Sequence, residues 1–150
     1  MASSGTSMTA AVTVITHQNH SALTLTFTNG SAGELKQGQS VNIKGSSNYT
    51  VELRDSGTAD FPAGIVIRGG IVGEKVSVLT PYIAVKKVHA KGGTINAGAF
   101  VKTNGVFNAD GLEEVVAAAS GDYVTEVVIK GGAVDTVLEV GVLNSPVRIA

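Results

Sequence analysis

Apolar and polar residues alternate along most of this 150-residue chain, and a period of two is typical of strands with one buried face. Leu23, Leu25 and Phe27 alternate with threonines, and residues 10–16 follow the same pattern. Comparable short runs recur up to the C-terminus and are separated by glycine-rich turns. The pattern predicts about ten strands, and strands spaced in this way favour a small β-barrel or sandwich.

Two segments depart from the alternation. Residues 1–9 are small and polar, without periodicity, and are expected to form an extended N-terminal arm. Residues 110–120 are the one helix-like segment, although their two adjacent valines also allow a strand. We therefore expect a mainly β chain with at most one short helix. After the arm, residues 10–59 form an N-terminal β segment that is a candidate for pairing with a neighbouring chain, and residues 60–150 form a compact β domain.

One short stretch occurs twice: VIRGGIV at residues 66–72 and VIKGGAV at residues 128–134. Neither copy has the glycine spacing of a phosphate-binding loop, and neither precedes a helical pattern. Apolar residues follow each glycine pair, as in a strand that resumes after a turn. The two copies are a weak hint of an internal duplication. Tight two-residue hairpin turns with positive φ angles are predicted at Gly69, Gly70, Gly131 and Gly132.

The N-terminal part of the chain carries no formal charge, since no Asp, Glu, Lys or Arg precedes Glu34. A neutral, β-prone strand edge tends to pair with other chains unless lysine, proline or a bulge guards it. Either this strand lies inside the sheet, or its free edge meets another chain by strand addition. In the second case, the residues expected to bind a larger partner or a neighbouring chain are Met8, Thr9, Ala10, Val12 and Val14.

Composition excludes several classes of partner. The net charge is −1 and the pI about 6.3, so the chain has no basic field that would attract nucleic acid. No apolar run reaches the roughly 18 residues that span a bilayer, so we expect no membrane partner. The chain has no cysteine, which excludes disulfides and thiolate metal sites.

Candidate chemistry is sparse. His17 and His20 have a spacing that could suit two metal ligands, but no carboxylate lies near them to complete a site. Glu113 and Glu114 are adjacent, so their side chains point in different directions and do not form an acid–base pair. We therefore predict no catalytic, cofactor-binding or metal-binding residues, and we expect that the protein is not an enzyme.

A small basic cluster contains Lys86, Lys87, Lys91 and His89. It has no interleaved aromatic residues on which bases could stack. On a strand its members would be divided between the two faces, so we interpret them as surface charges that favour solubility.

The strand that starts Gly73, Glu74 and continues through Val76 and Val78, with the glycine- and alanine-rich pattern around it, resembles a known family. Over residues 60–145 the chain is similar to the phage capsid cement, or head decoration, proteins, formerly a domain of unknown function. The resemblance implies a compact β domain that forms homotrimers at three-fold and quasi-three-fold positions of an icosahedral capsid. It implies the major capsid protein as partner, no catalytic residues, and a place on the outer capsid surface of the virion after assembly in the host cytoplasm.

Two other readings share this composition. A different structural phage β protein, such as a tail-tube or fibre component, would form rings or fibres instead of trimers. A carbohydrate-binding surface module would need aromatic platforms, and the chain has only three tyrosines and four phenylalanines.

Overall fold

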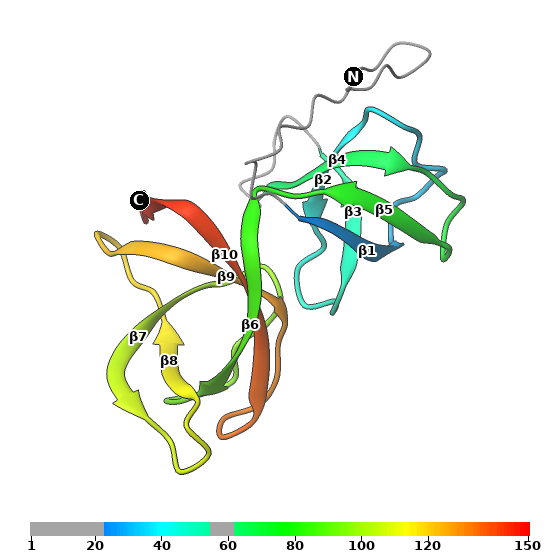
Figure 1. Ribbon diagram of the computed structural model, residues 1–150. Coiled ribbons are helices and arrows are strands. Elements are labelled where there is room, and N and C mark those ends of the chain that lie inside the picture. Colours follow the sequence, from blue (N-terminus) through cyan, green and yellow to red (C-terminus); the bar gives the residue numbers. More distant parts are fainter. Residues whose placement is uncertain (1–22, 55–61) are drawn as a thin grey trace, which may run out of the picture.

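The computed structural model describes residues 23–54 and 62–150, and their regular structure is entirely β (Figure 1). The predicted mainly β class and barrel architecture are confirmed, because these residues form two closed barrels of five strands each. The strands of the N-terminal barrel are β1 (Thr24–Asn29), β2 (Ser40–Ile43), β3 (Thr50–Leu53), β4 (Pro62–Arg68) and β5 (Lys75–Leu79). Those of the C-terminal barrel are β6 (Tyr82–Ala90), β7 (Phe100–Phe107), β8 (Glu113–Ala117), β9 (Tyr123–Lys130) and β10 (Val137–Arg148).

The two barrels have the same strand plan. Around the first the order is β1-β3-β2-β4-β5, and around the second it is β6-β8-β7-β9-β10. In each, the first and third strands are parallel and the other neighbours are antiparallel. The registers also agree: Phe27 lies opposite Val76, and at the equivalent place Val88 lies opposite Leu138. The two similar glycine-containing stretches therefore occupy equivalent places in two units of one fold.

Each barrel is filled mainly by β-branched side chains from alternate strand positions, which suit a pleated, narrow interior. Burial of each such side chain stabilises the fold by about 1.5–3 kcal/mol relative to exposure. Fully buried residues of the N-terminal barrel include Phe27, Val41, Val51, Val66, Val76 and Val78. Those of the C-terminal barrel include Val88, Ala90, Val115, Val128, Leu138 and Val140.

The helix considered at residues 110–120 is not formed. This segment contains strand β8, which pairs with β7 and β6. Val115 on β8 is fully buried in the C-terminal barrel, and the strand places its neighbours on alternate faces. Burial of this β-branched residue between two strands outweighs the weak helix propensity of the surrounding glutamates and alanines.

The hairpins around the glycine pairs are confirmed, since β4 pairs with β5 and β9 with β10. The position predicted for their turns is wrong. In the first hairpin the turn lies beyond Gly70, where the Glu74 amide donates to the Ile71 carbonyl at 3.0 Å. The positive φ of this hairpin belongs to Gly73, at 86°, and in the second hairpin to Asp135, at 64°.

The glycine pairs serve a close approach of two backbones instead. A Cβ added at Gly69 would lie closer than 3.0 Å to the carbonyl of Leu35, and one at Gly131 would lie equally close to that of Ile95. Leu35 forms an isolated bridge with Gly70, and Ile95 forms one with Gly132. Each glycine pair therefore lets the chain that leads into β2 or β7 lie against the end of β4 or β9.

The predicted division at residue 60 does not follow the barrels, because strands on both sides of it belong to the N-terminal barrel. The barrels meet between β5 and β6, at Thr80 and Pro81. Strand β1 pairs with β3 on one side and β5 on the other, so this part of the uncharged region lies inside the sheet. The candidate arm and the strand expected at residues 10–16 lie outside the described residues.

The two barrels also contact each other, and this contact between the β2–β3 loop and β9 is called the joint. The β2–β3 loop, residues 44–49, lies against the outer face of β9 in the C-terminal barrel. The Tyr49 amide donates to the Ile129 carbonyl at 3.1 Å, and the Ser46 amide donates to the Ala97 carbonyl at 3.2 Å. Val127 and Ile129 are fully buried within the core cluster that includes Phe27. One apolar cluster thus extends from the first barrel into the second.

Candidate functional site

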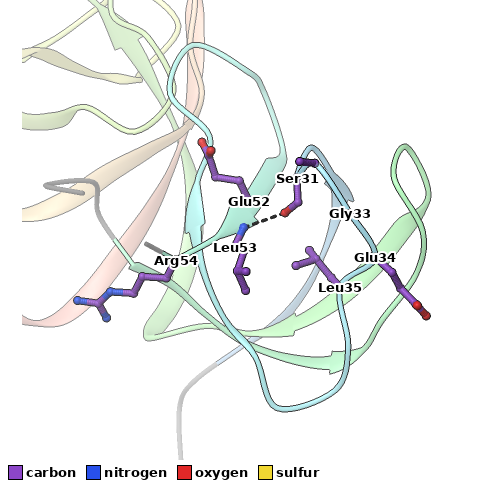
Figure 2. Close-up of a pocket in the computed structure, with 8 residues that line it drawn as sticks. Ser31, Gly33, Glu34, Leu35, Glu52, Leu53 and Arg54 are labelled. Carbon is purple, nitrogen blue, oxygen red and sulfur yellow. Dashed lines mark hydrogen bonds between the residues drawn. The ribbon is translucent and has the colours of Figure 1, made fainter. Parts of the chain in front are cut away.

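An open cleft of about 510 Å³ lies on the N-terminal barrel, between the β1–β2 loop and the end of β3 (Figure 2). Leu35 lines it as a buried residue and Leu53 as an exposed one. Charged side chains of Glu34, Glu52 and Arg54 lie around it. In Figure 2 the ends of Glu34 and Arg54 point away from each other, so the charges do not converge on one point. The cleft offers apolar surface with a charged rim, without the convergent polar groups of a catalytic pocket.

The wall of this cleft is held by the buried amide of Asn29. Its Nδ2 donates to the carbonyls of Gly33 and Gly70, both at 3.0 Å, and its Oδ1 accepts from the Ser31 amide at 2.8 Å. Ser31 Oγ in turn accepts from the Leu53 amide at 2.8 Å, the bond drawn in Figure 2. These polar groups are used to shape a loop, since each one satisfies a backbone group in a tight turn.

A partly buried charged cluster lies on the core-facing side of three strands of the C-terminal barrel. Lys86 on β6 contacts Glu113 on β8 at 2.9 Å and Glu126 on β9 at 2.7 Å. Glu126 is a buried residue, 9% exposed. Burial lowers the pKa of Lys86, but the hydrogen bonds and charges of Glu126 and Glu113 outweigh it and raise that pKa above the usual value. The cation therefore stays charged and ties three strands together.

This cluster was not predicted from the sequence, although a signal for it was present. Lys86 lies two residues from both Ala84 and Val88 along β6, and Glu126 lies two residues before Val128 on β9. A period of two places both charges on the face that carries the barrel core. The expectation that adjacent Glu113 and Glu114 diverge is confirmed: Glu113 contacts Lys86, whereas Glu114 accepts from Asn104.

The basic cluster is divided between faces, as predicted. Lys86 belongs to the interior cluster, while Lys91 lies 3.7 Å from Asp135 in the β9–β10 turn. His89 Nε2 lies 4.0 Å from the same carboxylate. His17 and His20 lie outside the described residues. Among residues 23–54 and 62–150, no His, Asp and Glu side chains form a group of three that could hold a metal ion. The same residues contain no helix long and apolar enough to cross a bilayer.

Tyr49 and Asn48 provide side-chain contacts across the joint. Its hydroxyl donates to a carboxylate oxygen of Glu139, and Asn48 Oδ1 accepts from the Gly131 amide at 2.9 Å. Burial raises the pKa of Tyr49 well above its usual value, and the hydrogen bond and negative charge of Glu139 raise it further. The phenol is therefore a neutral donor throughout the physiological range. Its hydrogen bond to the Glu139 carboxylate therefore stabilises the joint.

The motif behind the family resemblance has a structural role. Gly73 supplies the positive φ of the β4–β5 turn, and Glu74 Oε1 accepts from the Ile71 amide at 3.0 Å. Val76 and Val78 are fully buried on β5. The motif thus closes a hairpin and fills the barrel, and Gly69, Gly70, Gly131 and Gly132 act beside it as close-approach residues.

Large apolar side chains are exposed at the ends of several hairpins. Phe107, at the end of β7, is 67% exposed, and Tyr123, at the start of β9, is 71% exposed. Others that are exposed at or next to hairpin turns are Ile71, Val72, Val106, Val134 and Val137. Apolar residues gathered at such ends are typical of surfaces that contact other proteins.

Comparison with known proteins gives little. No family model matches the chain, and no curated protein matches it. Three chains of solved structures match, among them "The crystal structure of head fiber gp8.5 N base in bacteriophage phi29". That likeness has 14% sequence identity and a TM-score of 0.32, and it covers 85% of this chain and 98% of the other. A TM-score of 0.32 is too low to support an argument about function.

Proposed function

We propose that this protein is a structural component of a phage virion. In this proposal it decorates and stabilises the icosahedral capsid, as a homotrimer bound to the major capsid protein at three-fold and quasi-three-fold positions of the outer surface. It acts through contacts alone and is not an enzyme. It needs no cofactor and binds neither nucleic acid nor membrane.

The proposal is carried by a difference between polar and apolar side chains in the described residues: the polar ones bind within the chain, and large apolar ones are exposed. Polar side chains such as Asn29, Lys86 and Tyr49 are bound to groups of the same chain. Apolar side chains such as Val72 and Phe107 remain exposed at hairpin ends. A surface of this kind suits repeated contacts with other subunits better than the binding and turnover of a small molecule.

Weak contacts are sufficient for such a role. A single contact with a dissociation constant of about 1 mM corresponds to only about −4 kcal/mol. When three chains bind together, linkage can strengthen the whole by roughly 10²- to 10⁴-fold without any new contact. The motif of Gly73, Glu74, Val76 and Val78 supports the choice of the cement family, since the structure gives it the turn-and-strand role that a structural family needs.

The test uses capsids of the virus that encodes the chain, prepared without this protein. We expect the purified protein to sediment with these capsids, and a low-resolution image to show added density at the three-fold positions. The variant that lacks residues 1–9 should bind more weakly while its barrels stay folded, as measured by circular dichroism. If the protein does not sediment with capsids, the proposal is wrong. If the truncated variant binds as tightly as the full chain, the arm has no role in binding.

A further inference from the structure

The joint between the barrels is a contact between equivalent units. A loop between the second and third strands of one barrel, residues 44–49, covers the outer face of the fourth strand of the other. On that strand the Ile129 carbonyl accepts from the Tyr49 amide of the loop, and Val127 and Ile129 are both 0% exposed within the apolar cluster against which Tyr49 packs. The contact joins two different surfaces of equivalent units, a loop on one barrel and a strand face on the other, so it is head-to-tail.

The N-terminal barrel presents the same face without a cover. Ile65 lies opposite Ser40 and Leu79, just as Val127 lies opposite Phe100 and Gly141, so Ile65 is the equivalent of Val127. Ile65 is 41% exposed, whereas Val127 is fully buried. Ile67 is likewise partly exposed at the place of the buried Ile129. This uncovered surface, Ile65 and Ile67 on β4, is called the β4 face.

The C-terminal barrel presents the matching loop without a receiver. The pair Ile43 and Val51 encloses the joint loop. The equivalent pair, Thr103 and Val115, encloses the end of the β7–β8 hairpin, residues 104–114, which includes the last residues of β7 and is called the β7–β8 loop. The separations along the chain are 8 and 12 residues, so the second loop is four residues longer. It carries two exposed apolar side chains, Val106 at 50% and Phe107 at 67%. In Figure 1 this hairpin extends on the side of the C-terminal barrel that faces away from the N-terminal barrel.

We propose that the joint is repeated between copies of the chain: the β7–β8 loop of one copy binds the β4 face of the next. The occupant of the β4 face is thus a second copy of this protein. The two surfaces are the only equivalents of the joint that the described residues leave uncovered, and each carries exposed large apolar side chains. A head-to-tail contact closes into a ring or continues as a fibre. The inference names the contact between subunits of the homotrimer in the proposed function, and it rests on that proposed self-association.

A disulfide test suits this chain because it has no cysteine of its own. Copies with Phe107→Cys are mixed with copies with Ile65→Cys under mild oxidation, and covalent dimers are measured on a denaturing gel. Equal mixtures of Tyr123→Cys with Ile65→Cys are the matched control, since Tyr123 is equally exposed but lies outside the loop. We expect the first mixture to cross-link at least about tenfold faster than the control, because binding raises the effective concentration of the two thiols.

Several outcomes would overturn the inference. Cross-linking no faster than the control means that the two surfaces do not meet. Equally fast cross-linking of Phe107→Cys with itself means a symmetric contact in place of the head-to-tail one. If Ile65→Cys reacts with a thiol reagent only after residues 1–22 are removed, the chain's own N-terminal segment covers the β4 face.

A second measurement does not depend on the introduced cysteines. Phe107→Asp should raise the dissociation constant for self-association by about 30-fold or more, as measured by sedimentation velocity. Tyr123→Asp should leave it unchanged. If wild-type protein assembles through these surfaces but does not sediment with capsids, the proposed function fails and the inference stands. If Phe107→Asp assembles normally and sediments with capsids as well as wild type, the inference fails and the proposed function stands.

Discussion

The two barrels have one strand plan but fill it differently. At the position where the C-terminal barrel has Lys86, the N-terminal barrel has Leu25, and at the position of Glu126 it has Gly64. One barrel is therefore closed at this level by apolar packing and a close backbone contact, and the other by an ion cluster. The comparison shows that strand pairing defines this fold, whereas the barrel interior accommodates either apolar packing or an ion cluster at this level. The same comparison predicts which substitutions each barrel will not tolerate.

The largest effect is expected at Gly64, in the variant Gly64→Ala. Gly64 has a φ of 137°, and a Cβ there would lie closer than 3.0 Å to the carbonyl of Leu79 on β5. The backbone would have to move away from a strand that it pairs with, so we expect the free energy of unfolding to fall by about 3 kcal/mol or more. Urea denaturation followed by circular dichroism measures this change.

The matched control for Gly64→Ala is Gly33→Ala. No atom lies within 4 Å of a Cβ at Gly33, so this variant should stay within about 0.5 kcal/mol of wild type. A stability of Gly64→Ala equal to that of the control would show that β4 and β5 can separate at no cost. The N-terminal barrel would then resemble the C-terminal one, in which Glu126 occupies this position.

The next effect concerns the ion cluster. Lys86→Met leaves Glu113 and the buried Glu126 without their cation, and we expect the free energy of unfolding to fall by about 2 kcal/mol. This expected loss is smaller than that for a fully buried pair, because the Lys86 side chain is 41% exposed and solvent screens its charge. Lys87→Met, which changes the neighbouring exposed lysine, is the control. Denaturation of both variants at neutral pH gives the comparison.

The pH dependence of this difference has a definite sign. The pKa of Lys86 is raised in the folded protein, so its stabilising effect is complete below the usual lysine pKa of about 10.4 and is lost as the pH rises through the folded value. The stability gap between wild type and Lys86→Met should therefore narrow above about pH 10. A gap that stays constant to the most alkaline pH tested would mean that packing of the lysine stem, not its charge, stabilises the barrel.

Much of the fold was predictable from the sequence. The alternation around Leu25 and Phe27 predicted β1, and the expected number of about ten strands agrees with the ten that the described residues form. A period of two is a local property, which each strand carries in its own residues. Two of the failures had non-local causes. The role of Gly69 depends on Leu35, which is distant in sequence, and the strand at residues 110–120 depends on the burial of Val115 between β6 and β7.

The candidate sites were less predictable. Lys86 was interpreted as a surface charge, although its spacing from Val88 indicates the core-facing side of the strand. Its pairing with Glu113 and Glu126 depends on the strand order, which the sequence does not give. The joint could not be expected from periodicity, because the covered Val127 and the exposed Ile65 occupy similar patterns in the sequence. What separates them is which loop lies against them, and that is decided by the connection between the barrels. The arm of residues 1–9 stays a prediction.

A smaller effect is expected in the joint. Tyr49→Phe removes the donor to Glu139 and should lower the free energy of unfolding by about 1 kcal/mol. Hydrogen exchange of the Tyr49 and Gly131 amides, which both donate across the joint, measures the local effect. Tyr123→Phe, at a highly exposed position, is the control.

Alkaline pH should weaken the same contact. The pKa of Tyr49 is raised in the folded state, so its contribution is complete below the usual tyrosine value of about 10 and is lost as the pH rises above it. Tyr49→Phe removes this dependence. If exchange of the Gly131 amide is the same in Tyr49→Phe and wild type, the backbone bonds of the loop hold the joint without the phenol.

The smallest effect sharpens the comparison at a position that is buried in the N-terminal barrel and partly exposed in the C-terminal one. The buried Asn42 of β2 corresponds to Lys102 of β7, whose ammonium lies 2.9 Å from Asp122. The hydrogen bond from Lys102, followed by that from the Ala119 amide, lowers the pKa of the Asp122 carboxyl. The stabilising effect of the carboxylate is therefore present above its ordinary pKa and is lost as the pH falls through the lowered value.

Titration of Asp122 by NMR in wild type and Lys102→Met separates the two donors. In the variant we expect the pKa of Asp122 to rise toward the usual value of about 3.9 but to stay below it, because the Ala119 amide still donates to the carboxylate. Added salt should reproduce part of this rise in wild type, since an exposed ion pair is screened, and should have little effect in the variant. An unchanged pKa in Lys102→Met would show that the turn alone holds Asp122, and that the lysine at this position distinguishes the two barrels in sequence but not in energy.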